Sequence, residues 1–229
     1  MNGNPAKKPT GPGGTGHSIR SAGGSRSTAT ASQAARVPVY VTDTGACGQG
    51  TFAAAAISRG TLVATLAGER ISSDTCAQRV HDGVLRLDDP LQIGKLLYLD
   101  LDDASRLFNH SCNPNLGLRN ESDLFALRDI SRDEELRYDY ATTVSSDISI
   151  STWTMRCCCG AANCRELIGH VLTIPLAQTA AYLRAGTFQA FILRELRQVV
   201  AALDIARRVP ARAVDKSAAT ARRGDECDE

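Results

Sequence analysis

The 229-residue sequence is poor in aromatic residues and has no apolar run long enough to cross a bilayer. Aromatic side chains make up 5% of it, with a single tryptophan. Its first residues, MNGNPAKKPT, lack the apolar segment of a secretory signal peptide. A net charge of +1 gives no general attraction to nucleic acid or to an anionic membrane. We therefore expect a protein that is not secreted through a signal peptide and acts in the cytoplasm, or in the nucleus of a eukaryote.

Acidic residues are absent from residues 1–36, which are rich in Gly, Ser, Thr, Pro and Ala. Such a segment cannot bury enough apolar surface to offset its ordering entropy, so we expect a disordered basic tail. Residues 210–229 are mostly small or polar and should form a second flexible tail.

Between these tails, a strand-rich part precedes a helical part. Residues 72–83 allow either a helix or an irregular insert. Pro175 can open a helix that ends at Gly186, and residues 187–208 have apolar residues at helical spacing. We expect this pair, within 170–209, to pack on the strand domain as a cap. Short apolar runs between Gly-bearing turns predict strands at 37–41, 51–57, 61–68, 96–101, 116–119, 124–130 and 135–140.

The eight cysteines are unevenly spaced. Cys157, Cys159 and Cys164 form a C-x-C-x4-C pattern, whereas a secreted disulfide framework has more even spacing. Thiolates this close can bind one zinc ion, and a fourth ligand, for which Cys112 is the best candidate, would close a structural site. Free thiols are the alternative. Cys158 offers a competing register, but alternate residues of an extended segment point the same way, which favours Cys157 and Cys159.

Four motifs, in this order along the chain, resemble those of the SET-domain methyltransferases. The resemblance covers about residues 37–169. It implies a mostly β fold with some α, of the β-clip type, in which several small sheets form a SET domain at 37–141. A post-SET zinc segment at 142–169 and the two-helix cap would follow. The motifs are Gly48-Gln49-Gly50 with Gly68-Glu69, Asn109-His110-Ser111-Cys112 with Pro114-Asn115, Glu135-Leu136 with Tyr138-Asp139-Tyr140, and the cysteine pattern with Arg165.

The sequence departs in several places from the better-known eukaryotic members of this family. No cysteine-rich segment precedes Gly48, and the aromatic residue expected before Gly68-Glu69 is missing. Glu166 stands where glycine is common. These differences resemble a compact group often found in bacteria, so the resemblance does not itself imply a histone substrate.

The resemblance implies methyl transfer from S-adenosyl-L-methionine to a lysine side chain of a protein. It makes Tyr140 the catalytic tyrosine, and it gives Tyr138 a place where a hydroxyl favours monomethylation. Tyr98 is the best candidate for the other wall of the lysine channel. The implied cofactor contacts are Gly48, Gln49, Gly50, Asn109, His110 and Tyr140, and the implied ligands of one structural zinc are Cys112, Cys157, Cys159 and Cys164.

Two other functions stay open from the sequence. A catalytically silent SET-like module would bind a partner through the same groove, but it would not need to keep Tyr140, Asn109 and His110. A nucleic-acid-binding zinc domain is disfavoured because no stripe of basic and aromatic residues surrounds the cysteines. We expect a monomer that acts on a protein substrate and contacts neither membrane nor nucleic acid directly.

Overall fold

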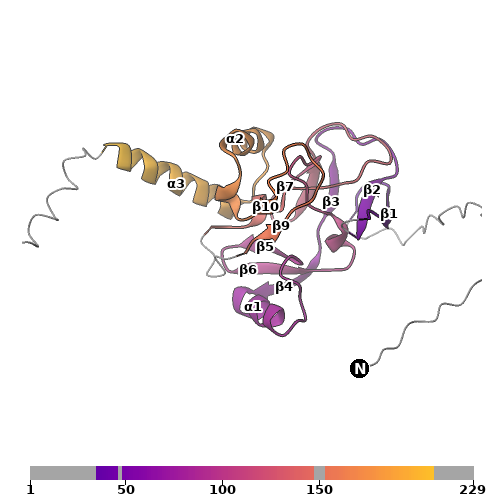
Figure 1. The fold of residues 1–229 in the computed structure, drawn as a ribbon, viewed down its shortest axis with the longest axis horizontal. Helices are drawn as coiled ribbons and strands as arrows, with labels where there is room; N and C mark the ends of the chain where they lie inside the picture. The colour runs from indigo at the N-terminus through magenta and orange to yellow at the C-terminus, as the bar shows by residue number, and fades with distance from the viewer. Residues whose placement is uncertain (1–34, 46–47, 147–152, 209–229) are drawn as a thin grey trace, which may run out of the picture.

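The computed structural model describes residues 35–45, 48–146 and 153–208. Both expected tails therefore lie outside the described residues, apart from residues 35 and 36. Within these ranges the strands are short and form small antiparallel sheets (Figure 1), which confirms the expected mostly β fold with some α. None of the described helices combines the length and apolar character that a membrane span requires.

The strands group into two three-stranded and two two-stranded sheets within the described ranges. The order β3-β8-β7 joins Leu62–Thr65, Asp123–Ala126 and Leu116–Arg119, and the order β4-β6-β5 joins Gly68–Ser72, Leu97–Leu101 and Pro90–Gly94. The remaining pairs are β1 (Val39–Asp43) with β2 (Gln49–Ala53), and β9 (Met155–Arg156) with β10 (Leu167–Ile168).

The core lies where these sheets face one another. Alternate residues of a strand point to opposite faces, so the apolar side chains of β7 and β8 converge on one side. Their burial removes large apolar surfaces from water and provides most of the driving force for this packing. Side chains with almost no exposed surface in this core include Phe108, Leu116, Leu118, Leu124 and Leu136.

The prediction of a strand at 135–140 is wrong. Leu136 N donates to Thr51 O at 2.8 Å, whereas Tyr138 N donates to Asn109 O at 3.1 Å. Because these backbone groups pair with two different segments, β2 and the loop at 109–112, the segment forms isolated bridges instead of a ladder. Tyr140 then begins a short 3-10 helix, η2 (Tyr140–Thr143). The run at 51–57 is likewise shorter than expected, since β2 ends at Ala53.

The uncertain segment at 72–83 contains a helix, α1 (Ser73–His81), whose amino end is capped by the Ser72 hydroxyl. A single turn of 3-10 helix, η1 (Ser105–Leu107), precedes the loop at 109–112. Another, η3 (Val171–Thr173), precedes the carboxy-terminal helices. The expected helix pair is present as α2 (Leu176–Ala185) and α3 (Ala190–Arg208).

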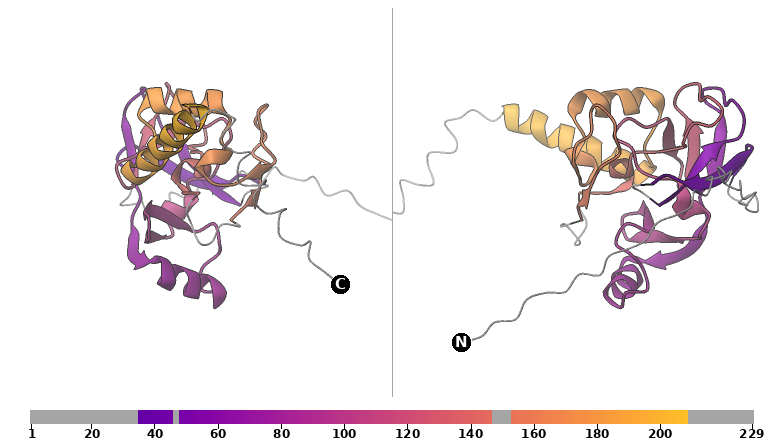
Figure 2. Two further views of the ribbon diagram at one scale, coloured as in Figure 1. Left: turned by 90° about the vertical axis from the view of Figure 1, so that its left-hand side faces the viewer. Right: turned by 45° about the vertical axis from the view of Figure 1, so that its right-hand side comes forward.

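Helix α2 and the start of α3 share a second apolar cluster, but the rest of α3 leaves the body of the molecule (Figures 1 and 2). Val200 and Leu203 are 58% and 55% exposed. The prediction that both helices pack as a cap therefore holds only for α2 and the first half of α3. Helical spacing identified an apolar face but could not show how far the body extends beneath it.

A buried polar network holds the start of α3 in place. The Gln189 side chain, in a residue only 1% exposed, donates to Gln92 O at 2.8 Å and to Glu121 O at 2.7 Å. Gln92 Oε1 in turn accepts from Ser145 N at 2.9 Å. Buried polar groups paired in this way specify one arrangement of the elements that carry them.

Gly117 on β7 lies against the link between α2 and α3. A methyl group at this position would lie 2.5 Å from Thr187 Oγ1 and 2.8 Å from Leu127 Cδ2. The link cannot retreat freely, because Phe188 N donates to Leu118 O at 3.0 Å. We expect Gly117→Ala to lower the free energy of unfolding by about 1–3 kcal/mol, measured by urea denaturation.

Gly94→Ala is the matched control, because the nearest atom to its added methyl group is Leu97 Cβ at 3.4 Å, an ordinary contact. An equal loss of unfolding free energy in the two variants would show that the close contact at Gly117 does not determine the effect.

Candidate active site and cysteine cluster

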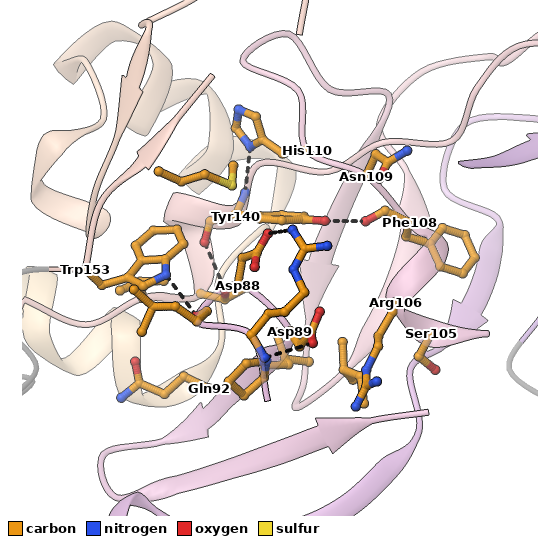
Figure 3. A pocket seen from close by; sticks show the side chains of 18 of the residues that line it. Asp88, Asp89, Gln92, Ser105, Arg106, Phe108, Asn109, His110, Tyr140 and Trp153 are labelled. Carbon is orange, nitrogen blue, oxygen red and sulfur yellow. Dashed lines mark hydrogen bonds and ion pairs between the residues drawn. The ribbon is translucent and has the colours of Figure 1, made fainter. Parts of the chain in front are cut away.

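A cavity of 1070 Å³ lies between the β4-β6-β5 sheet, the loop that follows η1 and the segment around β9 (Figure 3). This volume is at the upper end of the range for small-molecule sites, roughly 300–1,000 Å³. Of the residues assigned from the sequence to catalysis or cofactor binding, all but Gly50 line it. They are Gly48, Gln49, Tyr98, Asn109, His110, Tyr138 and Tyr140.

Gly50 is needed for close packing behind the cavity wall. A methyl group there would lie 2.6 Å from Glu135 Oε1 and 2.9 Å from Asn109 Nδ2. The Asn109 amide donates to Gln49 O at 3.1 Å and to Glu135 Oε1 at 2.9 Å, which joins the loop at Gly48–Gly50 to the segment at 135–140. Because these two bonds use the amide hydrogens, the Asn109 backbone and its Oδ1 are the groups left for a ligand.

Tyr140 lies across the middle of the cavity (Figure 3). Its hydroxyl donates to Phe108 O at 2.9 Å, and its backbone N–H donates to His110 Nδ1 at 3.2 Å. The ring lies 4.7 Å from that of Tyr138 and 5.4 Å from that of His110, measured between centroids. The expected shared side for the two tyrosines is thus observed, and the phenol of Tyr140 has a fixed orientation.

The two other tyrosines of the cavity keep their protons at neutral pH. Burial raises the pKa of Tyr98 to about 12, with a further contribution from Cys76. Burial also raises the pKa of Tyr138. Tyr98 Oη is buried and has no hydrogen-bond partner among the described residues, so it is available to a bound group. Neither phenol can serve as a general base near neutral pH.

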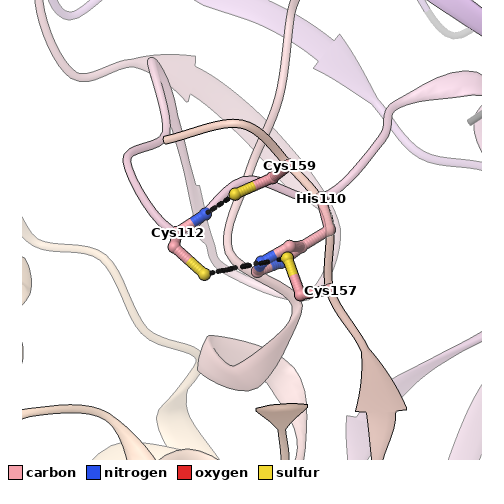
Figure 4. Close-up of side chains that lie close together, drawn as sticks. All are labelled: His110, Cys112, Cys157 and Cys159. Carbon is pink, nitrogen blue, oxygen red and sulfur yellow. Dashed lines mark hydrogen bonds between the residues drawn. The ribbon is translucent and has the colours of Figure 1, made fainter. Parts of the chain in front are cut away.

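Three cysteine sulfurs meet next to the cavity (Figure 4). Cys112 Sγ lies 3.9 Å from Cys157 Sγ, and Cys159 Sγ accepts from Cys112 N at 3.4 Å. Sulfurs bound at about 2.3 Å to tetrahedral zinc would lie about 3.8 Å apart. The ligand atoms of these cysteines and of His110 all lie within 4.8 Å of one another, so the donor set fits zinc in chemistry and spacing.

Cys164 lies outside that mutually close set but interacts with it. Its thiol donates to Cys157 O at 3.5 Å. Burial raises the pKa of the Cys159 thiol, but hydrogen bonds from the amides of Cys112 and Ala161 and from the thiols of Cys157 and Cys164 lower it to about 6. Such a thiol is readily converted to the thiolate that a metal requires.

Cys158, the competing member of the triple-cysteine run, is exposed. It does not belong to the group of close potential ligands found among the described residues. The backbone alternation at β9 and beyond thus turns Cys157 and Cys159 inward and leaves Cys158 outside.

His110 supports the cluster through its hydrogen bonds. Its Nδ1 accepts from Tyr140 N–H, a group that can only donate, and its Nε2 lies 3.3 Å from Cys112 Sγ. Burial lowers the pKa of His110 to about 3, helped by the charges of Arg165 and Arg137, so the ring is neutral. This network places the single ring proton on Nε2, where it points at the Cys112 sulfur. A protonated Nε2 is a donor to a thiolate and has no lone pair for zinc.

Arg165 joins the cluster to the segment that carries Tyr140, a role that we did not foresee from the sequence. Its backbone N and Nε donate to Cys112 Sγ at 3.3 Å and 3.4 Å, and its Nη2 donates to Asp139 Oδ1 at 2.5 Å. The expectation that Asp139 is a structural acceptor on the opposite side from Tyr138 and Tyr140 agrees with these contacts. The only signal for Arg165 was its position directly after Cys164.

Glu166, which replaces the glycine common in the family, has a φ of 60°. This left-handed conformation suits glycine better than a residue with a Cβ. The backbone is held there because Cys157 N donates to Glu166 O at 2.7 Å.

Further residues complete the cavity wall without any signal in the sequence. Trp153 Nε1 donates to Leu87 O at 3.1 Å, and Arg86 pairs with Asp88 at 3.2 Å. Figure 3 shows Trp153 and Asp88 on the same side of the cavity, near Tyr140.

Residues 48–141 match the family model described as "SET domain". This part of the chain is a SET domain that contains strands β2 to β8 and most of the cavity wall. It contributes Cys112 to the cysteine cluster, whose other sulfurs come from residues after the match.

Curated relatives match about half of the chain. The "Histone-lysine N-methyltransferase, H3 lysine-9 specific" of Schizosaccharomyces pombe is 36% identical over 135 residues, which are 46% of this chain and 28% of that protein. "Histone-lysine N-methyltransferase ASHR3" of Arabidopsis thaliana is 31% identical, covering 57% and 28%. "Histone-lysine N-methyltransferase, H3 lysine-9 specific dim-5" of Neurospora crassa is 31% identical, covering 56% and 50%. The chain thus spans between 28% and 50% of the length of these relatives.

Among solved structures, the chain resembles "crystal structure of KRYPTONITE in complex with mCHG DNA and SAH" with a TM-score of 0.44 and 23% identity. The likeness covers 58% of this chain and 29% of that one.

We expect the purified protein to contain about one zinc ion per chain, measured by mass spectrometry of the metal content. Cys112→Ser or Cys159→Ser should lose most of it and melt at a lower temperature, because metal binding to such a site also stabilises the fold. Cys158→Ser is the matched control and should retain both zinc and stability, since Cys158 is exposed.

The choice between Cys164 and His110 as fourth ligand follows from two more variants. Cys164→Ser should release zinc and His110→Ala should keep it. The reverse pattern would make His110 the ligand.

Proposed function

We propose that this chain is an S-adenosyl-L-methionine-dependent protein-lysine N-methyltransferase whose single zinc ion is structural. The observation that carries the proposal is the convergence of Tyr140, the loop at 109–112 and the cysteine cluster on one cavity. The relatives named as histone-lysine N-methyltransferases support it. The zinc would be held by Cys112, Cys157, Cys159 and Cys164.

S-adenosyl-L-methionine supplies an electrophilic methyl group on a sulfonium sulfur. Gly48, Gln49 and the Asn109 backbone lie on one part of the cavity wall and would hold this co-substrate. Tyr98, Tyr138 and Tyr140 supply phenol groups that would surround the incoming lysine. Positioning two reactants in line, among polar groups that are already fixed, is the main source of rate for such a displacement.

The lysine amine must be neutral to attack. As its nitrogen forms the new bond to carbon, the carbon–sulfur bond breaks and its electron pair stays on sulfur. Tyr98 and Tyr138 hold their own protons because burial raises the pKa of each. Transfer of the ammonium group into a buried channel lowers the pKa of lysine, so its proton would leave to solvent before the chemical step.

A histone is a reasonable first substrate to test, because the names of two of these relatives specify histone H3. The chain nevertheless covers no more than half of those three relatives, so their remaining parts provide no guide to substrate choice here. Peptide arrays with single lysines therefore belong beside histone H3 in the first assay.

We expect Tyr140→Phe to lower methyl transfer from tritiated S-adenosyl-L-methionine by about a hundredfold, because the ring stays but the oriented hydroxyl is lost. The measurement is label incorporated into histone H3 and the peptide arrays. Tyr40→Phe is the matched control, since the Tyr40 hydroxyl donates to Asp133 on the surface, away from the residues that line the cavity.

A silent binding module remains the competing function. It would bind the co-substrate in calorimetry yet transfer no label to any protein or peptide. Equal activity of wild type and Tyr140→Phe would also contradict the proposed catalytic site.

We propose monomethylation as the main product, since Tyr138 is buried against Tyr140, and its hydroxyl would then occupy space near the lysine nitrogen that Tyr140 orients. Tyr138→Phe should increase the fraction of di- and trimethyllysine by about tenfold by enlarging that space. Mass spectrometry of the product peptides measures it. An unchanged product distribution would remove Tyr138 from this role.

A further inference from the structure

Helix α2 lies outside the residues matched by the SET family model, yet two of its side chains reach the site. Gln178 and Tyr182 are one helical turn apart and share a face. Gln178 Nε2 donates to Cys112 O at 2.7 Å and to Tyr182 Oη at 2.6 Å. The Gln178 amide thus contacts both the loop that carries His110 and the side chain of Tyr182, one turn along the helix.

Tyr182 in turn forms a hydrogen bond with a buried carboxylate. Its hydroxyl donates to Asp139 Oδ2 at 3.1 Å, and the Asp139 side chain is fully buried. The other oxygen, Oδ1, accepts from Arg165 Nη2 at 2.5 Å and from Ala141 N at 3.1 Å. Among the described residues, Tyr182 is therefore the side chain that donates a hydrogen bond to Oδ2.

We propose that α2 is a positioning element for methyl transfer, and that the Tyr182 hydroxyl holds Tyr140 in its reactive orientation through Asp139. The inference rests on the proposed methyltransferase function and extends it to a helix outside the matched domain. Tyr182 is not among the residues that line the cavity, so it is a positioning residue and not a catalytic one.

The physical link runs through the cap of η2. Asp139 is the amino-terminal cap of this 3-10 helix, and Tyr140 is its first residue. If Oδ2 loses its donor, the buried carboxylate retains an unpaired oxygen, which costs free energy unless the side chain moves to find a partner. Any such rotation also moves the Ala141 amide bound to Oδ1, and with it the start of η2. A displacement of about 1 Å in a reacting group can reduce the rate about a hundredfold.

A purely structural role for Tyr182 is the alternative. Its ring lies in the second apolar cluster and contacts the Phe188 ring edge-on, with centroids 6.1 Å apart. Phenylalanine would preserve this packing and remove only the hydroxyl. The variant Tyr182→Phe therefore separates the hydrogen bond to Asp139 from the packing of the ring.

The test compares Tyr182→Phe with Thr179→Val, a matched variant on the same helix. Thr179 is also buried, and its hydroxyl reaches only carbonyl oxygens of Ile174 and Pro175, at 3.4 Å and 3.3 Å. With histone H3 and tritiated S-adenosyl-L-methionine, Tyr182→Phe should lower kcat about ten- to hundredfold. The KM for the co-substrate should change by less than about twofold. Thr179→Val should keep the wild-type kcat even if its melting temperature falls by as much as that of Tyr182→Phe.

A second measurement does not depend on activity. In nuclear magnetic resonance spectra of the full chain, Tyr182→Phe should shift the Tyr140 amide and the His110 ring signals, while Thr179→Val should leave them in place. If wild type transfers no label to histone H3, the proposed function fails for that substrate, and these spectra still decide the link. Unshifted signals in Tyr182→Phe, or an equal loss of kcat in both variants, would overturn the positioning role.

Discussion

Two backbone hydrogen bonds, Tyr138 N to Asn109 O at 3.1 Å and Ser111 N to Tyr138 O at 3.0 Å, hold the site together. They fix the loop at 109–112 beside the segment at 135–140, so that each residue of the loop has a defined neighbour on that segment. His110 then receives the amide of Tyr140, and Cys112 reaches the sulfurs contributed from beyond residue 153. The cavity wall and the cysteine cluster both depend on this register, because neither stretch belongs to a sheet that would fix it independently.

A buried ion pair, Asp139 with Arg165, lies next to these two hydrogen bonds. Asp139 and Arg165 are paired where water is excluded, which is costly unless further hydrogen bonds satisfy both groups. The carboxylate receives such bonds from Ala141 N and Tyr182, and the guanidinium donates through Nε to the Cys112 sulfur, but Arg165 Nη1 is buried with no partner among the described residues. A pair of this kind contributes little net stability but penalises any other alignment of the segments it joins. We interpret it as a device for specificity of arrangement.

The sequence was most informative where chemistry and spacing coincide. The N-H-S-C and Y-D-Y stretches, the cysteine pattern and Gly186 identified the fold, the tyrosine pair and the Asn109-His110 pair of the cavity wall, and the end of α2 without coordinates. The strand predicted at 135–140 was wrong, because the backbone donors and acceptors there pair with separate segments of the chain. Pairing between distant segments leaves no local pattern in the sequence. The roles of Arg165, Tyr182 and Trp153 were not apparent for the same reason, because they rest on contacts with residues distant in the sequence. The exposed half of α3 shows the converse limit, since an apolar stripe does not indicate what lies beneath it.

The family match ends at residue 141, yet the groups that complete its interior come later. The sulfurs opposite Cys112, the guanidinium opposite Asp139 and the hydroxyl of Tyr182 are all contributed from beyond that point. A fragment cut there would keep every recognisable motif of the domain but expose a lone carboxylate and a lone thiol in what was its interior. The stretch that the family model recognises is therefore smaller than the unit whose buried polar groups are paired, and any transplantation of this domain between proteins must carry its carboxy-terminal neighbour with it.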